Sequence, residues 1–267
     1  MGPVGGPDPS ILAPRTTAAM APGLILALAA VVLATSFLSG VFGMAGGMIL
    51  MGVLLSFLSV PSAMVLHGTT QAASNGWRAF LWRAYVDWRI LARYVVGSLV
   101  AFASFVAVRF VPDRALVLIA LGLMPFAVMA VPARMAPRVD RRLGAESAGF
   151  ISTALQLISG VSGPALDLVF VRTELDRRHV VATKAVCQVS SHLMKLLYFG
   201  AVAGSDTGGL GWPVLAMSIV LALTGTTLSR SLLERLTDAQ FRLWTQRIVM
   251  GIGLVYLAQG LWALTQR

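Results

Sequence analysis

Apolar runs separated by short polar loops fill most of the chain. Ten such runs can be delimited, at residues 24–40, 44–58, 62–82, 89–109, 114–131, 147–160, 164–172, 179–201, 211–229 and 245–264. A helix that crosses a bilayer needs about 20 residues. Four runs are shorter, and they form two pairs, 24–40 with 44–58 and 147–160 with 164–172. The pattern predicts an all-α, polytopic integral membrane protein in which two helix pairs are broken or re-entrant at glycine-rich junctions.

The two halves of the chain resemble each other around these junctions. Residues 39–43 read Ser-Gly-Val-Phe-Gly, and residues 159–163 read Ser-Gly-Val-Ser-Gly, 120 positions later. Polar residues also recur at matched places in the helices that follow, 117 positions apart. Two matches in the same order indicate an internal repeat. We predict a first repeat at 23–131, a cytoplasmic basic loop at 132–146, a second repeat at 147–267, and a disordered segment at 1–22, which is rich in Pro, Gly and Ala.

The arginines indicate which loops face the cytoplasm. Four clusters hold 15 of the 21 basic residues. They are Arg78/Arg83/Arg89/Arg93, Arg134/Arg138/Arg141/Arg142, Arg172/Arg177/Arg178 and Arg230/Arg235/Arg242/Arg247. Cytoplasmic loops carry an excess of Lys and Arg, so we expect these clusters inside and the loops at 59–61 and 202–212 outside. Segment 62–82 then runs inward and segment 179–201 outward, so the repeats are predicted to be inverted, as in many transporters.

Composition supports the membrane assignment and excludes several classes of protein. The chain is 57% hydrophobic and 12% charged, whereas soluble domains carry about 25% charged residues. The net charge of +10 comes mainly from arginines in short loops, which argues against binding of nucleic acid. Cys187 is the only cysteine, so the chain can form no internal disulfide or multi-cysteine metal site. There is no His-Glu-x-x-His, phosphate-loop or Gly-x-Ser-x-Gly motif, and we expect no catalytic residue, metal or cofactor.

Two polar stripes interrupt the long segments 62–82 and 179–201. The first consists of His67, Gln71, Ser74, Asn75 and Arg78, and the second of Lys184, Gln188, Ser191, His192 and Lys195. In each stripe the spacing i, i+4, i+7, i+8, i+11 places the members on one helical face. A charge at the centre of a membrane helix costs about 2.5–3.5 kcal/mol, so the stripes are expected to face a partner or a wet cavity. Because they offer mainly hydrogen-bond donors and positive charge, they predict a path for an anion.

The glycine-rich junctions form a second group of candidate binding residues. They contribute Gly43, Gly46 and Gly47 from the first junction and Ser162 and Gly163 from the second. Glycine allows a sharp break and close approach of backbones. If the breaks lie at the membrane centre, the free N–H groups of the following helices point inward and favour an anion. Tight helix packing through small residues is the alternative interpretation.

Simpler roles stay open for the polar residues as well. Amides and hydroxyls can hold helices together, and Arg78, Lys184 and Lys195 lie near helix ends, where long side chains reach lipid headgroups. If the stripes do line a path, His67 and Lys195 are expected at its outer mouth, and Arg78 and Lys184 at its inner mouth. Asp167, the one acidic residue of the second short pair, either favours a helix start or is a proton-coupling site.

Several short motifs resemble those of the TauE/SafE sulfite exporter family. They are the junction Gly43-Met44-Ala45-Gly46-Gly47, the following Gly52-Val53-Leu54, the Val86-Asp87-Trp88 signature and the stretch 180–200. Ala45 stands where family members have glycine, and Gly52 where they have proline, which leaves the exact substrate open. The resemblance spans about residues 23–264. It implies an inner-membrane carrier for sulfite, sulfonates or other sulfur-containing or organic anions, often moved outward.

We therefore expect a multi-pass inner-membrane transporter, a secondary carrier whose partners are a small anion and the lipid bilayer, and not nucleic acid. Two other classes stay open. An intramembrane enzyme would use His192 or Asp167, and a non-transporting subunit would assemble with other membrane proteins. The sequence leaves open the substrate, the direction of transport, the coupling ion, the number of full crossings and the oligomeric state, a homo-oligomer included.

Overall fold

The computed structural model describes most of the chain after residue 20. The described ranges are 21–42, 44–132, 135, 137–170, 173–203, 210–233 and 237–266. The predicted segment 1–22 therefore lies almost entirely outside the described residues, as do Gly43, Arg134, Arg172 and Arg235.

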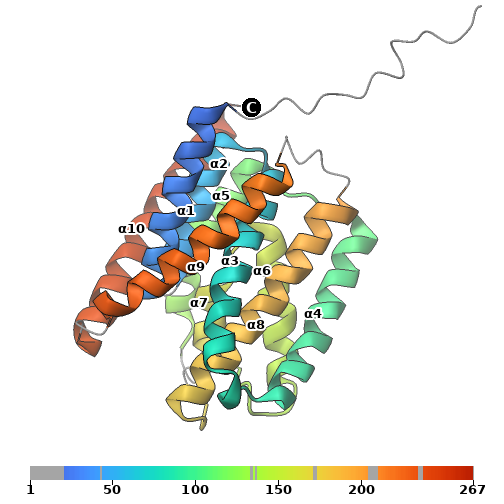
Figure 1. Ribbon diagram of the computed structural model, residues 1–267. Helices are drawn as coiled ribbons and strands as arrows, with labels where there is room; N and C mark the ends of the chain where they lie inside the picture. Colours follow the sequence, from blue (N-terminus) through green and yellow to red (C-terminus); the bar gives the residue numbers. More distant parts are fainter. Residues whose placement is uncertain are drawn as a thin grey trace, which may run out of the picture.

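Within these ranges the chain forms helices and turns, with no strand. The α-helices are α1 Pro22–Phe42, α2 Met44–Phe57, α3 Val60–Leu81, α4 Trp88–Val108, α5 Arg114–Ala130, α6 Gly144–Ser159, α7 Gly163–Phe170, α8 Arg177–Leu197, α9 Trp212–Leu233 and α10 Asp238–Thr265 (Figure 1). A 3-10 turn, η2, covers Arg83–Tyr85, and a π turn, η4, continues α8 over Tyr198–Val202. Each predicted apolar segment overlaps with one of these α-helices, so the all-α prediction is confirmed.

One predicted helix length is wrong. The segment 24–40 is expected to be too short for a crossing, but α1 has 21 residues and is long and apolar enough to span a bilayer. The helix is longer because it begins at Pro22, where a missing N–H costs nothing in the first turn, and because it continues through Gly40 to Phe42. By contrast α2, α6 and α7, with 14, 16 and 8 residues, are short as predicted.

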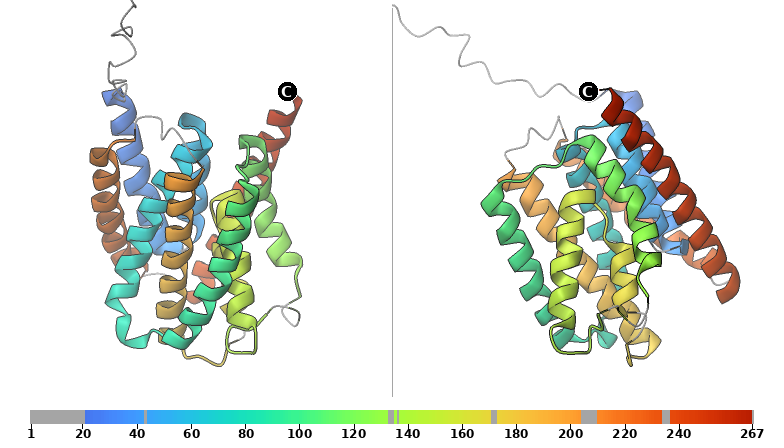
Figure 2. Two further views of the ribbon diagram at one scale, coloured as in Figure 1. Left: turned by 90° about the vertical axis from the view of Figure 1, so that its right-hand side faces the viewer. Right: turned by 180° about the vertical axis from the view of Figure 1, so that it is seen from behind.

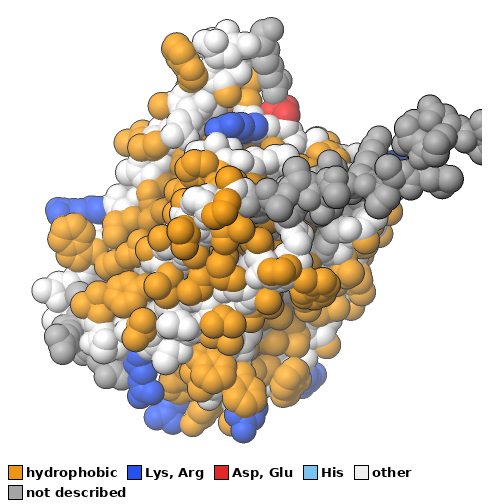
Figure 3. Space-filling view, turned by 45° about the horizontal axis from the view of Figure 1, so that its top comes forward, with side chains coloured by type: hydrophobic (Ala, Val, Ile, Leu, Met, Phe, Trp, Pro, Cys, Tyr) orange, Lys and Arg blue, Asp and Glu red, His pale blue; other side chains and the backbone are white. Residues whose placement is uncertain are grey.

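The length and the surface of the helices fit a membrane. In the described part of the chain, four stretches can span a bilayer: Pro22–Phe42, Trp88–Val108, Trp212–Leu232 and Leu243–Thr265. On the face shown in Figure 3, hydrophobic side chains cover the middle and Lys and Arg side chains lie around the margin. Many large apolar side chains are exposed on the surface of the protein; Trp212, for example, is 78% exposed. A continuous apolar surface of this kind belongs in lipid, so the chain is a polytopic membrane protein.

Two antiparallel hairpins break inside the bundle. Residue 43 alone separates α1 from α2, and residues 160–162 separate α6 from α7. Gly160 ends α6 with a φ of +79°, a left-handed conformation that glycine adopts without strain. A side chain at Gly46 would collide with the backbone of Thr35 and Ser39, so α2 packs backbone to backbone on α1. The first residues of α2 and α7 are largely buried, and both helices begin in the protein interior.

The two halves pack with the symmetry of an inverted repeat. α1 packs along α9 as α6 packs along α4, while α3 packs on α8 and α5 on α10. α3 and α8 run in opposite directions (Figure 1), and α10 crosses obliquely over α5 (Figure 2). Ser74 Oγ lies 2.7 Å from Thr226 Oγ1, which joins α3 to α9, and Ser191 Oγ lies 2.6 Å from Tyr94 Oη, which joins α8 to α4. Each stripe helix thus contacts the helix that follows the other stripe helix: α3 contacts α9, and α8 contacts α4.

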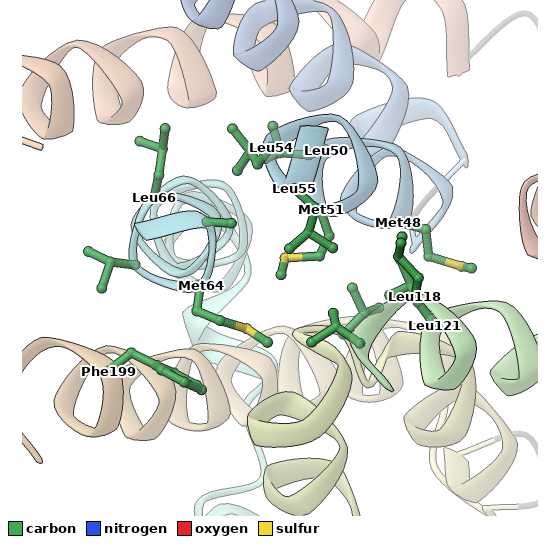
Figure 4. Close-up of a cluster of buried hydrophobic side chains, with 14 of the residues drawn as sticks. Met48, Leu50, Met51, Leu54, Leu55, Met64, Leu66, Leu118, Leu121 and Phe199 are labelled. Atoms are coloured by element: carbon green, nitrogen blue, oxygen red, sulfur yellow. The ribbon is translucent and has the colours of Figure 1, made fainter. Parts of the chain in front are cut away.

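Two apolar clusters fill the interior, one towards each end of the bundle. The larger one runs along α2 and against the last turns of α4, and it includes Met48, Leu55, Met64 and Leu121, all completely or almost completely buried (Figure 4). The smaller one surrounds Tyr94, near the starts of α4 and α8. The bundle is therefore packed more extensively at one end than at the other.

Ion pairs connect the arginine clusters at the less packed end. Arg138 lies 2.6 Å from Asp140 and 2.8 Å from Glu174, and Arg93 lies 2.7 Å from Glu146. The hydrogen bond from Arg138 holds the pKa of Asp140 below its ordinary value. The Arg93 pair ties α4 to the first turn of α6, and the Arg138–Glu174 pair ties the loop before α6 to the segment before α8. Three arginine-rich regions consequently gather at the same end of the bundle.

Candidate functional site

A polar cavity lies where the broken helices meet. It encloses about 40 Å³ of open volume. Its lining consists of Ser39, Met44, Gly47, His67, Gln71, Asn75, Arg78, Gln156, Val161, Ser162, Gly163, Asp167, Lys184, Gln188 and His192. Both stripes and both junctions contribute, so the fold brings together polar residues that are far apart in the sequence.

The two junctions touch each other at this cavity. A Cβ atom built on Gly163 would lie 2.8 Å from Cβ of Met44 and 3.6 Å from Nε2 of Gln188. A Cβ atom on Gly47 would lie 3.3 Å from Nε2 of Gln71. Glycine is therefore needed at Gly163 for the close approach of α2 and α7, and the backbone at both helix starts is accessible from the cavity.

Equivalent basic residues bind the ends of the first half-helices. Arg78 Nη2 donates to the carbonyl oxygen of Ser39 at 3.4 Å, near the end of α1. Lys195 Nζ donates to the carbonyl oxygen of Gly160 at 2.8 Å, directly after α6. The last carbonyls of a helix have no intrahelical partner and carry partial negative charge. Each stripe thus stabilises the break of its own repeat with its last basic residue.

The other end of each stripe binds the second half-helix. His67 Nε2 donates to the carbonyl oxygen of Gly47 at 3.0 Å, and Lys184 Nζ donates to Asp167 Oδ1 at 2.5 Å. Gly47 and Asp167 are 120 positions apart, the same offset as the two junctions. The repeat seen in the sequence therefore extends to the hydrogen bonds that hold the cavity together.

Four buried polar atoms in the lining have no hydrogen-bond partner among the described residues. They are Gln71 Nε2, Gln156 Oε1, Ser162 Oγ and His192 Nδ1, on side chains that are at most 5% exposed. An unpaired buried donor or acceptor costs about 1–3 kcal/mol. Their concentration around one small cavity indicates a place that is completed by a polar ligand or by water.

The cavity meets solvent at its charged end. The side chains of Lys184 and Asp167 are 27% and 36% exposed, whereas His67 and His192 are 1% and 3% exposed. Lys184 lies near the start of α8, towards the arginine-rich loops, whereas the large apolar cluster (Figure 4) includes Tyr198, which follows the other end of α8. Access is thus asymmetric although the helix arrangement is symmetric.

Some predicted site residues lie outside the lining. Gly43 lies outside the described residues. Gly46 packs against α1, and Ser74 and Ser191 join neighbouring helices. The expectation that Lys195 lies at an open outer mouth is wrong, because it is 0% exposed. Apolar side chains fill the end of the bundle away from the arginine-rich loops, so the side-chain nitrogen of Lys195 is enclosed by the protein.

Some members of the lining lie outside the predicted set of site residues. One is Gln156, a long polar residue in the short apolar segment 147–160. Ser39 belongs to the repeated junction motif, and Met44 follows it. A polar residue within a turn of a predicted helix break is the signal that could have identified Gln156.

A larger apolar cavity adjoins the polar one. It encloses about 440 Å³ between α5, α7 and α10. Its lining consists of Met44, Pro125, Val128, Met129, Pro164, Asp167, Leu168, Thr245, Gln246, Val249 and Met250. Met44 and Asp167 line both cavities, so a molecule with a polar and an apolar part could occupy both. Among the described residues, no group of three or more His, Cys, Asp or Glu side chains is placed to hold a metal ion.

Comparison with known proteins identifies one similar family. The family model described as "Sulfite exporter TauE/SafE" matches residues 27–256. This range begins in α1 and ends in α10, so it includes both hairpins, both stripes and the whole lining of the polar cavity. The comparisons with curated proteins and with solved structures found no match.

Proposed function

Since the chain belongs to the sulfite exporter TauE/SafE family, we propose that it transports small anions and that the polar cavity binds one of them at a time. The observation that carries this proposal is the set of unpartnered polar atoms. Gln71 Nε2 and Ser162 Oγ are buried donors without an acceptor. An amide N–H and a hydroxyl both donate to an anionic oxygen, which would offset the cost of their burial.

The helix starts support the same ligand class. α2 begins at Met44 and α7 at Gly163, and both residues belong to the lining. The first N–H groups of a helix lack intrahelical partners and carry partial positive charge. Two such starts next to buried side-chain donors favour an oxyanion over a cation or a neutral solute.

The charge of the lining favours a monoanion. Among its described side chains, Arg78 and Lys184 each contribute one positive charge and Asp167 removes one, with the histidines neutral. The lining therefore carries one net positive charge. A bound monoanion cancels this charge, whereas a cation would add to it in a medium of low dielectric constant.

Size restricts the part of the ligand that the polar cavity holds. One water molecule needs roughly 10–15 Å³ on the same measure, so the 40 Å³ of the cavity accept a few waters or an oxyanion of a few heavy atoms. Sulfite and the head of a sulfonate belong to this class. An organic substituent would extend past Met44 into the apolar cavity. The substrate proposed is thus sulfite, a sulfonate or another small sulfur-containing or organic anion.

The setting proposed for this activity is the inner membrane. The arginine-rich end would face the cytoplasm, because Lys and Arg are enriched in cytoplasmic loops. The cavity would then be accessible from the cytoplasm in this conformation, as an exporter requires for loading. The protein would act as a secondary carrier. Asp167, the one carboxylate of the described lining, is a first candidate for coupling, but its ion pair with Lys184 engages it in this conformation.

The rival classes receive less support from the site. An intramembrane enzyme would need a side chain activated as a nucleophile, acid or base. Asp167 is instead bound to Lys184, and His192 forms a long, 3.4 Å hydrogen bond with the amide of Gln156. A non-transporting subunit would have no use for unpartnered donors around a cavity. Neither rival explains why both repeats direct a polar stripe to one place.

Reconstitution in liposomes tests the proposal. Purified protein should exchange radiolabelled sulfite for internal sulfite, and a panel of sulfate, methanesulfonate, a longer alkylsulfonate and chloride should compete according to size and charge. Gln71→Leu should weaken competition by sulfite, and Gln259→Leu, which changes an exposed glutamine on α10, should not. Exchange of no anion at all would contradict transport.

A further inference from the structure

Lys195 is a completely buried lysine next to the polar cavity. Its Nζ atom lies 2.8 Å from Nδ1 of His67 and 2.8 Å from the carbonyl oxygen of Gly160. Its Cε atom packs close to Gly68 on α3. In the part of the chain that the structure describes, no carboxylate forms an ion pair with it. Both of its partners are neutral acceptors.

The other ionisable groups around α8 are engaged elsewhere. On α7, Asp167 binds Lys184, which lies 11 residues before Lys195 and hence about 16 Å away along the helix axis. On α4, Tyr94 binds Ser191, and in η2, Tyr85 binds Arg178. In η4, Tyr198 donates to the backbone carbonyls of Phe105 and Phe110. Directly after α6, Lys195 binds the backbone carbonyl of Gly160. His67 on α3 and His192 on α8 are thus its titratable neighbours.

The direction of the hydrogen bonds links Lys195 to the cavity. The carbonyl oxygen of Gly47 can only accept, so His67 donates to it through Nε2. Nδ1 of the neutral ring then has a free electron pair and accepts from Lys195. His67 lines the cavity, and its ring centroid lies 5.7 Å from that of His192. An anion in the cavity would therefore lie one side chain away from Lys195.

We infer that Lys195 and His67 form a proton-binding site that is loaded together with the anion, so that the protein co-transports anion and proton. The inference rests on the proposed anion-binding function. A buried ammonium group without a carboxylate is costly, and a nearby anion removes much of this cost. The anion thus favours the proton, and by linkage the proton favours the anion to the same extent.

The step balances in atoms and charge. A proton enters from water through the cavity and forms an N–H bond with the uncharged pair, which then carries one positive charge. The anion adds one negative charge, so the loaded site has the same total charge as the empty one. On release the N–H bond breaks and the proton returns to water on the side where the anion leaves. No oxidant, reductant or further group takes part.

Two substitutions of Lys195 separate this role from a structural one. Glutamine can still donate a hydrogen bond to Gly160 and His67 but binds no proton in this range. Arginine keeps the charge and the donors but does not release its proton. If Lys195 only caps α6, the glutamine or the arginine variant should still couple anion transport to the pH gradient. If Lys195 carries the transported proton, both variants should lose this coupling.

The experiment uses proteoliposomes and radiolabelled sulfite in two assays. The first measures exchange of sulfite at equal pH on both sides, and the second measures accumulation driven by a pH gradient, acidic on the side of entry. Protein-free liposomes correct for passive entry, and the forms of sulfite in solution are the same for every variant. We expect the wild type and Ser104→Ala, an exposed α4 residue, to accumulate sulfite in response to the gradient. Lys195→Gln and Lys195→Arg should exchange sulfite but lose the driven accumulation.

Each outcome decides between defined alternatives. Driven accumulation retained in Lys195→Gln would overturn the proton site and leave anion transport intact. Exchange by the wild type without any response to the gradient would do the same. Absence of exchange in the wild type would overturn the proposed function and the inference with it. If both Lys195 variants fail to fold, proton uptake on addition of sulfite to purified protein decides: the wild type should take up more protons than His67→Gln, and equal uptake would contradict the inference.

Discussion

Lys184 Nζ lies 2.5 Å from Asp167 Oδ1, so an ion pair closes the solvent-exposed end of the polar cavity. It joins the first polar residue of the second stripe to the short helix α7. Both side chains line the cavity. The carboxylate of Asp167 therefore binds the same ammonium group, that of Lys184, which an incoming anion would bind. Under the proposed function, Asp167 would compete with the substrate for Lys184.

Replacing this carboxylate should tighten anion binding. Asp167→Asn leaves Lys184 free and raises the positive charge of the lining. A partly exposed ion pair is worth up to about 1 kcal/mol, so we expect the half-saturating concentration of sulfite exchange to fall by up to about fivefold. Lys184→Gln should shift it in the opposite direction, and both shifts should shrink at high salt. An unchanged half-saturating concentration in Asp167→Asn would contradict the competition.

Loss of a buried donor should weaken binding more strongly. Gln71→Leu removes an unpartnered amide from the cavity at nearly constant volume. A hydrogen bond to a charged group contributes about 1.5–3 kcal/mol, so we expect a loss of about tenfold or more in sulfite affinity. Gln188→Leu should also lose affinity, as Gln188 occupies the equivalent position in the second repeat. The matched control is Gln259→Leu, and equal affinities in all three variants would mean that the stripes only pack helices.

The first hairpin should tolerate no side chain at Gly46. A methyl group there collides with the backbone of α1, which cannot move aside as a side chain can. Overpacking costs about 1–3 kcal/mol, so Gly46→Ala should lower the midpoint of thermal unfolding in detergent, and Gly46→Leu should abolish transport without preventing membrane insertion. Gly251→Ala is the control, since nothing lies near that position on α10 and alanine favours a helix. Full stability and transport in Gly46→Leu would contradict the close packing.

Labelling of single cysteines should reveal the orientation in the membrane. Val111 lies between α4 and α5, and Arg142 lies before α6 at the arginine-rich end; both are exposed. Cys187 is fully buried and should remain unlabelled. In intact cells an impermeant thiol reagent should label Val111→Cys, and should label Arg142→Cys only after the membrane is opened. The reverse pattern would contradict the inside assignment of the arginine clusters.

The sequence alone predicted the helices and part of the site. Apolar runs with glycine-rich breaks located every α-helix, because helix hydrogen bonds are local and the bilayer requires backbone groups to be paired within the segment. The stripes were visible because polar side chains are costly inside a membrane helix. The length of α1 was misjudged because helix ends depend on a few residues, here Pro22 and Phe42, whose polarity gives little signal.

What each polar residue does was decided by the tertiary structure. Arg78 and Lys195 occupy equivalent positions in the two stripes, yet Arg78 lines the cavity and Lys195 is enclosed behind His67. The spacing of residues along one helix determines which of them share a face. It does not determine which side chains of another helix meet that face, because contacts such as Lys195 with Gly160 and His67 depend on how separate helices pack. The sequence by itself thus determined a membrane protein with two polar helices and two breaks. Only the packing of α3 and α8 around the hairpins decided which polar side chains line the cavity without a hydrogen-bond partner among the described residues.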